Sequence, residues 1–489
     1  MESRQKLGLL LGSIIFITMI SIPAPESMNP LGMKAAAVSM LMAIFWVTEA
    51  ISIFATSCIP IFLFPLLGVL DSKQIAGSYG HHIVLLILGA FFVAKAIEAN
   101  NLHKRIALST IKLVGTSRSR IILSFMIATG LLSMWTSNNS TTLMMLPIGM
   151  AILQRENARG ADLLGFAPAL MLSIAFAASI GGTGTLIGTP PNLLFVSTIE
   201  EIFPDAPPIT FTNWLKIGIP FVILFMPIAW FYLVKYFKIS GNLQGSESII
   251  EREYEDLGPI SKGETRVIII LFFYALGFIF RDSWSSFLGV ESYVKDSTVA
   301  FIASSLLFTL SSGQKDSNGK EKKLLEWEDA KTIPWGIAIL IGGGLAIAAS
   351  YKSTGLISWI ADSINLKDIP ILIVVLLVVT SMVFLTEINS NAASTAIFLP
   401  VLAGLSKAGG LHPYLLMIPA TIAASCAFML PSGTGPNASV LASGYLSIPQ
   451  MAKAGLGLNL MAIIIIVATM YFVTLPSLDI TSELPFWAL

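Results

Sequence analysis

Two clusters of hydroxyl and amide side chains interrupt otherwise apolar stretches of the chain. Ser137-Asn138 lies in the first cluster, and Ser390-Asn391 lies in the second, 253 residues later. Such side chains donate hydrogen bonds to anions, and their oxygen atoms are hard ligands of the kind that alkali cations take. One such residue alone is more typical of helix–helix contacts in a membrane. The matched clusters at corresponding positions instead predict a functional site.

Glycine and proline break two further apolar segments in matching ways. The breaks are 181–192 and 431–437, and both end in a Pro-Asn pair. Neither stretch can stay helical, because glycine is conformationally permissive and proline lacks an amide donor. Unwinding frees carbonyl oxygens, which suit sodium, and a restarting helix presents free N–H groups to an anion. A simple proline kink would explain either break alone, but not the matched pair.

The composition indicates a membrane protein. Of the 489 residues, 55% are hydrophobic and only 12% are charged, whereas soluble domains carry about 25%. The formal net charge is zero, so the chain has no electrostatic footprint for nucleic acid. Cys58 and Cys426 both lie in apolar segments and fit no disulfide framework. No catalytic constellation and no phosphate-binding motif is present, which argues against an enzyme or an ATP-driven pump.

The elements that must position these residues are transmembrane helices. Apolar runs recur along the whole chain, and each can cross a layer about 30 Å thick. The runs 121–153 and 369–405 are too long for one crossing and are polar at their centres, which predicts re-entrant helical hairpins. The predicted fold is an all-α polytopic membrane protein, an inverted repeat with two re-entrant helical hairpins and two broken transmembrane helices.

The predicted boundaries follow the matched motifs. An uncleaved transmembrane helix is expected at the N-terminus, rather than a cleaved secretory signal. Two repeats follow, separated by an acidic polar linker. In order, the units are the N-terminal helix 1–30, the first repeat 31–240 with hairpin 119–153 and broken helix 164–200, the cytoplasmic linker 241–265, and the second repeat 266–489 with hairpin 369–405 and broken helix 414–445.

The distribution of basic residues predicts the topology. With the N-terminus in the cytoplasm, and with 34–49 and 51–70 counted as two crossings, most Lys and Arg residues fall on the cytoplasmic side. Lys104, Arg105 and the cluster 320–323 belong to that set. An odd number of crossings then separates the two copies, which gives them opposite orientations. We expect an inner (plasma) membrane protein with an external C-terminus.

The motifs together resemble the divalent anion/sodium symporter family, di/tricarboxylate transporter type, over essentially the whole chain. The resemblance is carried by the two Ser-Asn tips and by the turns 188–192 and 433–437. It implies a homodimer that works by an elevator motion, with a sodium site at each tip and the anion between them. The implied sodium ligands are Ser133, Ser137, Asn138, Gly188, Thr386, Asn389, Asn391 and Gly433. The implied substrate-binding residues are Ser137, Asn138, Asn139, Thr189, Pro190, Ser390, Asn391, Ala392, Thr434 and Gly435.

Three positions depart from the family pattern. Family tips usually read Ser-Asn-Thr, but the third positions here are Asn139 and Ala392, and Gly435 stands where proline is usual. These departures put the identity of the anion in doubt more than the coupling ion. Neither tip nor either break contains Lys, Arg or His, which favours sodium coupling over exchange.

For several other features the sequence allows more than one role. Glu387, beside the second tip, is either a proton carrier or a hydrogen-bonded structural carboxylate. His81 and His82 open an apolar span, and their spacing does not predict a transition-metal site, so sodium is the only metal expected. A channel is a rival reading, because re-entrant hairpins also occur in channels.

The function predicted from the sequence is sodium-coupled symport of small divalent anions. The expected substrates are C4-dicarboxylates such as succinate or malate, carried by an elevator mechanism. The alternatives are sodium-coupled transport of sulfate or another inorganic anion, and sodium-independent anion exchange. The expected partners are the anion, Na⁺, the lipid bilayer and a second copy of the chain, with no cofactor beyond the coupling ion and no nucleic acid.

Overall fold

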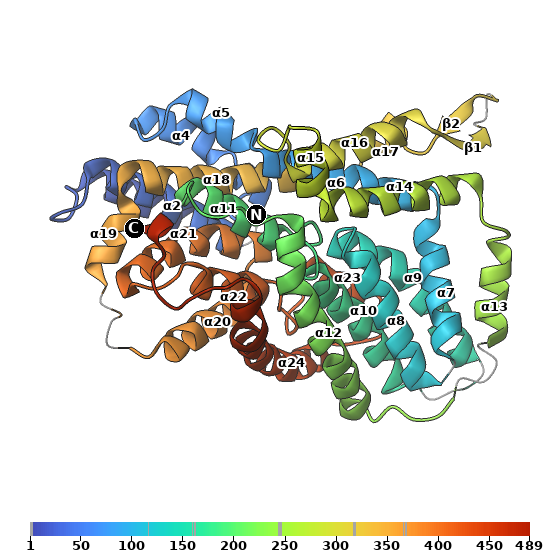
Figure 1. Cartoon of the computed structure of the whole chain (residues 1–489). Coiled ribbons are helices and arrows are strands. Elements are labelled where there is room, and N and C mark those ends of the chain that lie inside the picture. The colour runs from blue at the N-terminus through green and yellow to red at the C-terminus, as the bar shows by residue number, and fades with distance from the viewer. Residues whose placement is uncertain are drawn as a thin grey trace.

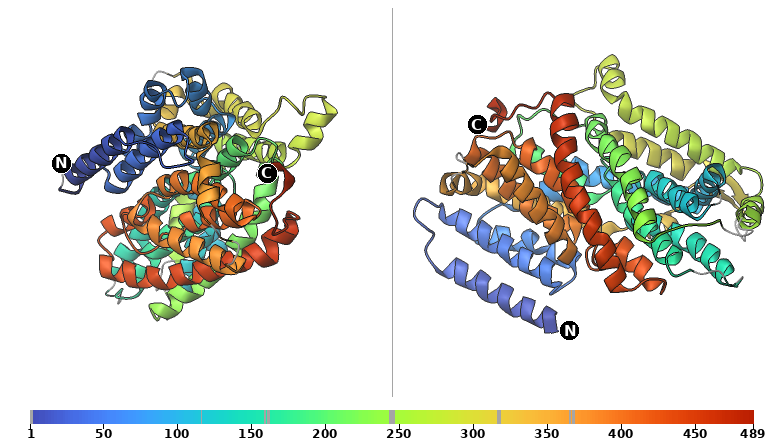
Figure 2. Two further views of the ribbon diagram at one scale, coloured as in Figure 1. Left: turned by 90° about the vertical axis from the view of Figure 1, so that its left-hand side faces the viewer. Right: turned by 90° about the horizontal axis from the view of Figure 1, so that it is seen from below.

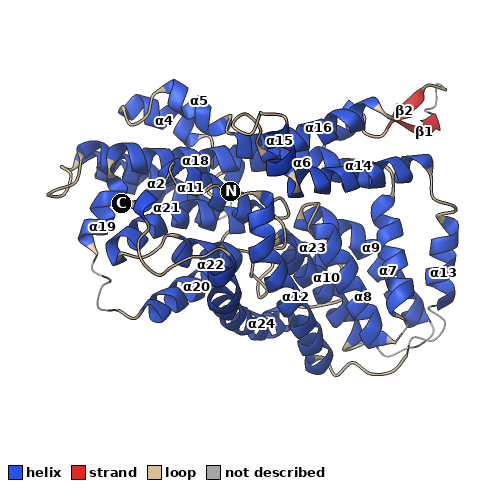
Figure 3. Cartoon of the chain, in the orientation of Figure 1, coloured by secondary structure: helices blue, strands red, loops and turns tan. Residues whose placement is uncertain are grey.

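The computed structural model is almost entirely helical (Figures 1 and 3). It describes residues 3–115, 117–158, 160, 163–242, 247–315, 319–364, 366 and 369–489. The described residues contain one small sheet, formed by two antiparallel strands. The class predicted from the sequence, an all-α membrane protein, is confirmed.

The N-terminal helices form one edge of the molecule. Figure 2 shows α1 lying alongside α2 at this edge. Only Gly8 and Gly12 of α1 are buried, so most of its apolar surface is left to face lipid. The helices of this part are α1 (Ser3–Ser21), α2 (Pro30–Thr48), α3 (Ile53–Thr56), α4 (Ile59–Leu67), α5 (Ser72–Tyr79) and α6 (His82–Ala99).

The first polar cluster lies between two helices of a hairpin, and the first break lies between two further helices. The hairpin helices are joined by 134–137, and the break spans 183–189. The elements are α7 (Leu102–Val114), the hairpin helices α8 (Arg118–Ser133) and α9 (Asn138–Ala158), the broken pair α10 (Phe166–Gly182) and α11 (Pro190–Ile202), and the long α12 (Phe211–Tyr236).

The middle of the chain connects the two sets of motifs. It contains α13 (Glu247–Asp256), α14 (Lys262–Ile279), α15 (Arg281–Phe287), α16 (Asp296–Thr309), β1 (Ser311–Lys315), β2 (Glu321–Lys323) and α17 (Trp327–Ala330). The stretches 238–265 and 312–332, interpreted from sequence as polar loops, thus hold a helix and most of a β-hairpin. Residues 243–246 of the predicted linker lie outside the described part of the chain.

The second polar cluster and the second break repeat the arrangement of the first. The hairpin helices α20 and α21 are joined by 389–390, and the break spans 425–434. The elements are α18 (Trp335–Thr354), α19 (Leu356–Ser363), α20 (Ile371–Ile388), α21 (Asn391–Gly409), α22 (Tyr414–Ala424), α23 (Gly435–Ala442), α24 (Ile448–Thr469), η1 (Met470–Thr474), α25 (Leu475–Ser477) and η2 (Phe486–Ala488).

Eight helical segments among the described residues are long and apolar enough to cross a membrane, or nine if α14 and α15 count as one bent span. The chain is therefore a multi-pass membrane protein. One predicted crossing differs: 51–70 contains two short helices, α3 and α4, in place of one span. Pro60 and Pro65 lie in this stretch, and proline disrupts the hydrogen bonds of a continuous helix.

The helix α10 is the centre of the core. All 17 of its residues are buried, and it packs against both helices of the first hairpin and against α23. It packs tightly against α8 at Gly181, where a methyl group would lie 2.5 Å from the Cα of Gly130. Small residues commonly allow such close helix contacts in membranes. This contact fixes the distance between the first hairpin and the first break.

We predict that Gly181→Ala destabilises the protein by about 1–3 kcal/mol, because the added methyl group meets backbone that cannot move aside. The measurement is thermal unfolding in detergent, followed by tryptophan fluorescence. Gly77→Ala is the matched control, since nothing lies within 4 Å of a methyl group at that helical position. Equal melting temperatures for the two variants would contradict the close-packing interpretation.

Candidate functional site

The tip of the first hairpin is held by the hydroxyl of Ser133. This hydroxyl lies 2.7 Å from Oδ1 of Asn138 and 2.8 Å from the carbonyl oxygen of Ala178. Ser133 ends α8, Asn138 begins α9, and Ala178 belongs to α10, so the contacts join the hairpin to the broken helix. Thr185, in the break itself, donates its hydroxyl to the carbonyl of Met134.

The second tip repeats this geometry. The hydroxyl of Thr386 lies 2.7 Å from Oδ1 of Asn391 and 2.8 Å from the carbonyl oxygen of Ala424 in α22. The hydroxyl of Ser432, in the second break, donates to the carbonyl of Glu387 at 3.1 Å. Two segments about 250 residues apart thus form the same hydrogen-bonded unit.

An asparagine in the first turn of the helix that follows each break closes the turn. The amide of Asn192 donates to the carbonyl oxygens of Gly182 and Thr185, at 3.3 and 2.7 Å. The amide of Asn437 donates to those of Ala427 and Leu430, at 3.1 and 3.0 Å. These carbonyls belong to unwound backbone, which must find partners inside the protein because a bilayer offers none.

Both tips and both breaks line one cavity of about 560 Å³. All ten residues predicted to bind substrate are on its wall: Ser137, Asn138, Asn139, Thr189, Pro190, Ser390, Asn391, Ala392, Thr434 and Gly435. The structure therefore brings together residues from four separate segments, as a shared binding site requires. Their contact with a substrate stays a prediction.

Four helix N-termini meet at this cavity. The helices α9, α11, α21 and α23 each contribute first-turn residues to its wall. A helix N-terminus carries roughly +0.5 of an elementary charge, so four of them amount to about +2. Among the described residues that line the cavity none is Lys, Arg or His, and Glu49 is the one charged side chain. The positive potential here comes from backbone dipoles, not from basic side chains.

The residues predicted to bind sodium lie at and behind the cavity wall. Four of them line it (Ser137, Asn138, Asn391 and Gly433), and four do not (Ser133, Gly188, Thr386 and Asn389). Their arrangement repeats in the two halves. A methyl group at Gly188 would lie 2.9 Å from the carbonyl oxygen of Ser133, and one at Gly433 would lie 3.0 Å from that of Thr386.

Several buried oxygen atoms around the two breaks lack a hydrogen-bond partner. They are Oγ of Ser179 and Oδ1 of Asn192 in the first half, and Oγ of Ser425 and Oδ1 of Asn437 in the second. Buried polar atoms are almost always paired, and orphaned acceptors in matching places fit sites for a bound cation. Asn389 differs, because its Oδ1 already accepts the N–H of Ser390 at 2.9 Å and its amide nitrogen has no partner.

The carboxylate of Glu387 fills the second break. It accepts the backbone N–H groups of Phe428, Met429 and Leu430 at 2.7 to 3.1 Å, and the side-chain amide of Asn459 at 2.7 Å. Four separate donors hold this carboxyl group in one position. This geometry favours the structural role for Glu387 over the role of proton carrier.

Sequence reasoning did not foresee the opposite wall of the cavity. This wall is formed by α3 and by the start of α18. In the part of the chain that the structure describes, it includes Ile53, Phe54, Thr332, Pro334, Ile337 and Leu340. These residues carry no recognisable motif, and only the packing of α3 against α18 places them here.

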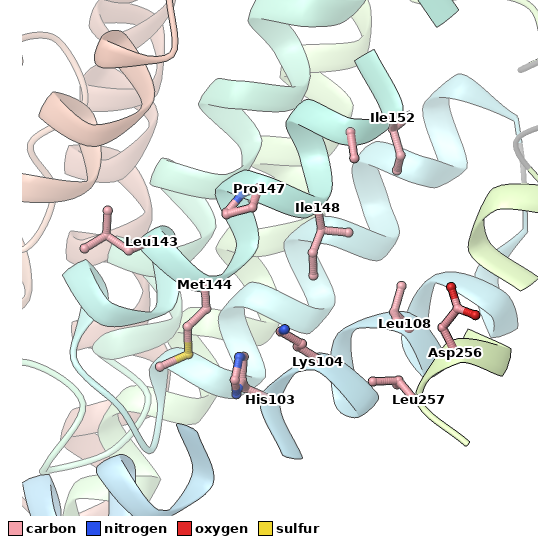
Figure 4. A pocket seen from close by; sticks show the side chains of 11 residues that line it. His103, Lys104, Leu108, Leu143, Met144, Pro147, Ile148, Ile152, Asp256 and Leu257 are labelled. Atoms are coloured by element: carbon pink, nitrogen blue, oxygen red, sulfur yellow. The ribbon is translucent and has the colours of Figure 1, made fainter. Parts of the chain in front are cut away.

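A second cavity, of about 630 Å³, lies apart from both tips (Figure 4). It is formed by α7, α9 and the end of α13, and most of the side chains that line it are apolar. Leu143, Pro147 and Ile148 face it from α9, with His103 and Lys104 on α7. Although it is the larger of the two, it brings together none of the matched polar motifs.

The fold and the cavity together define a multi-pass helical membrane protein with a polar pocket enclosed by helix ends. The chain belongs to the family described as the sodium:sulfate symporter transmembrane region, whose family model matches residues 3–478. The predicted membership of the divalent anion/sodium symporters is confirmed.

Curated relatives match almost the whole chain. A sodium-dependent dicarboxylate transporter, SdcS, of Staphylococcus saprophyticus is 39% identical over 98% of this chain and 94% of the relative. SdcS of Staphylococcus aureus is equally similar, with the same coverage.

Two solved structures share the fold at low sequence identity. The YdaH transporter of Alcanivorax borkumensis has a TM-score of 0.54 at 15% identity and covers 83% of this chain and 90% of its own. MtrF of Neisseria gonorrhoeae has a TM-score of 0.56 at 12% identity, and the match covers 96% of this chain and 94% of MtrF.

Two departures from the family pattern, Asn139 and Gly435, are in contact across the cavity. A methyl group at Gly435 would lie 2.5 Å from Cγ of Asn139.

We predict that Gly435→Ala pushes the Asn139 amide out of its rotamer and lowers stability by about 0.5–1.5 kcal/mol. In the Asn139→Ala variant, Gly435→Ala should lower stability by a smaller amount, because the amide that the methyl group would overlap is absent. A double-mutant cycle of thermal unfolding measures the coupling, and purely additive effects would contradict the contact.

Proposed function

We propose that the protein is a secondary active transporter that couples the entry of sodium to the symport of small divalent anions. The observation that carries this proposal is the cavity where four helix N-termini and both Ser-Asn tips meet, with no basic side chain among the described residues that line it. The matched polar units support a site with two similar ends, which suits a ligand with two anionic groups.

Electrostatics link the anion to sodium in this proposal. A dianion transferred from water loses its hydration, and an uncompensated buried charge is costly. Helix dipoles and hydroxyl donors offset part of that cost. Sodium at the two tips supplies full positive charges and pulls the oxygen atoms of Ser133, Asn138, Thr386 and Asn391 into position. Sodium therefore binds first and completes the anion site.

The substrate proposed here is a C4-dicarboxylate such as succinate or malate. Relatives that cover almost all of this chain are named sodium-dependent dicarboxylate transporters. The cavity has two polar ends, so each tip can bind one carboxylate, with donors from Ser137 and Asn139 on one side and Ser390 on the other. Sulfate is the second candidate. The family description names it, and Ala392 offers no side-chain donor at the second tip.

The remaining parts of the proposal concern the motion and its setting. We infer an elevator motion in which the hairpins and broken helices carry the cavity past the wall formed by α3 and α18. The protein acts in the cell inner (plasma) membrane as a homodimer with a cytoplasmic N-terminus. The two repeats have opposite orientations. Lys104 and Arg105, which follow α6, support this topology by the positive-inside rule.

The test is uptake of labelled succinate into proteoliposomes, with and without an inward sodium gradient. We expect saturable uptake that requires sodium and is competed by malate. In Ser133→Ala and Thr386→Ala, the sodium concentration for half-maximal uptake should rise at least about tenfold, since a charge-assisted ligand contributes about 1.5–3 kcal/mol. Ser305→Ala is the matched control, because that exposed hydroxyl contacts only its own helix.

Two results would revise the proposal in different ways. Sodium-dependent uptake of sulfate with no uptake of succinate would keep the coupling mechanism and change the substrate. Uptake that is indifferent to sodium, with wild-type behaviour of both tip variants, would contradict the coupling mechanism and favour exchange.

A further inference from the structure

Three potential metal ligands meet where α6 begins and α11 ends. Nε2 of His82 lies 2.8 Å from Oε2 of Glu200, and Nε2 of His81 lies 3.8 Å from the same oxygen. All three ligand atoms lie within 4.8 Å of one another. The two histidines are adjacent in sequence, and Glu200 is 118 residues from His82, so only the fold assembles this cluster.

We propose that His81, His82 and Glu200 bind a transition-metal ion of the Zn²⁺ type. Zinc takes imidazole nitrogen and carboxylate oxygen at about 2.0–2.2 Å, so tetrahedral ligand atoms lie about 3.3 Å apart. The separations of 2.8 and 3.8 Å bracket that spacing. Two imidazoles and one carboxylate form a ligand set that suits zinc and leaves a coordination position for water.

The surroundings allow an ion to enter. The three side chains are 20–25% exposed, and His81 also lines an open cavity of about 620 Å³. Nδ1 of His82 is buried and has no hydrogen-bond partner. When Nε2 of His82 binds a metal, Nδ1 carries the proton of the neutral imidazole and lacks an acceptor, which lowers the affinity.

Three nearby groups moderate the affinity. Nδ1 of His81 accepts the backbone N–H of Ile83 at 3.4 Å, and this long contact must be given up when Nε2 binds a metal. The positive charge of Lys295 acts on both His81 and Glu200, whereas the negative charge of Asp296 acts on His82. These opposing charges favour a moderate affinity over a tight structural site.

A metal at this cluster would tie α6 to α11. The N-terminus of α11 carries Thr189 and Pro190 into the cavity between the tips, and its other end carries Glu200. A bound ion therefore clamps a helix of the candidate site to a helix outside it. Resting on the proposed function, we infer that the clamp inhibits transport by holding the two helices together.

The first experiment measures binding and does not depend on transport. The full chain is purified without a histidine tag, treated with chelator, and titrated with Zn²⁺ by calorimetry and by competition with a zinc indicator. We expect one ion per chain, and at least about tenfold weaker binding in His81→Ala, His82→Ala and Glu200→Gln. His103→Ala is the matched control, because His103 lies at the separate α7–α9 cavity and should not change the affinity. Thermal unfolding without metal checks that each variant is folded.

The second experiment measures the effect of Zn²⁺ on succinate uptake. Wild type and His103→Ala should be inhibited, and His82→Ala should resist at least about tenfold more Zn²⁺. Stoichiometric binding without any uptake would support the metal site and count against the proposed function. Absence of stoichiometric binding, or equal binding by wild type and the three ligand variants, would overturn the metal site whatever the transport result.

Discussion

The structure depends on one constraint: a helix that stops inside an apolar layer leaves backbone groups without partners. The first N–H groups of a helix and the freed carbonyls of an unwound turn are costly in hydrocarbon. Here four helices begin around one cavity, and the hydroxyls of Ser133 and Thr386 and the two break asparagines donate hydrogen bonds to backbone carbonyls near the breaks. The groups that remain open point to ligands, namely donors for an anion and oxygen atoms for a cation.

The two halves meet this constraint in different ways. Ser133-Met134 in the first tip corresponds to Thr386-Glu387 in the second. Glu387 places a carboxylate on the N–H groups of its own break, while the apolar side chain of Met134 cannot. The backbone N–H groups of the second break therefore have a side-chain acceptor, which Met134 cannot supply in the first half. Asn139 of the first half also packs against Gly435 of the second.

Much of the site could be predicted because it rests on local signals. Pro-Asn turns and polar residues within apolar runs identify helix breaks and hairpin tips without any alignment. The wall formed by Phe54 and Ile337 could not be predicted, because apolar residues carry no sign of which helix they will contact. The meeting of Glu200 with His82 had no sequence signal either, as it depends on the relative placement of α6 and α11. The short α3 and α4 in place of one crossing reflect prolines that a hydropathy count overlooks.

The central claim is that sodium completes an anion site made of helix ends. Its most direct test is calorimetric titration of the purified protein with succinate, in sodium buffer and in potassium buffer of equal ionic strength. The account predicts saturable binding in sodium and at least about a hundredfold weaker binding in potassium, because no basic side chain among the described residues of the cavity wall can replace the ion. Equal affinity in the two buffers would contradict it.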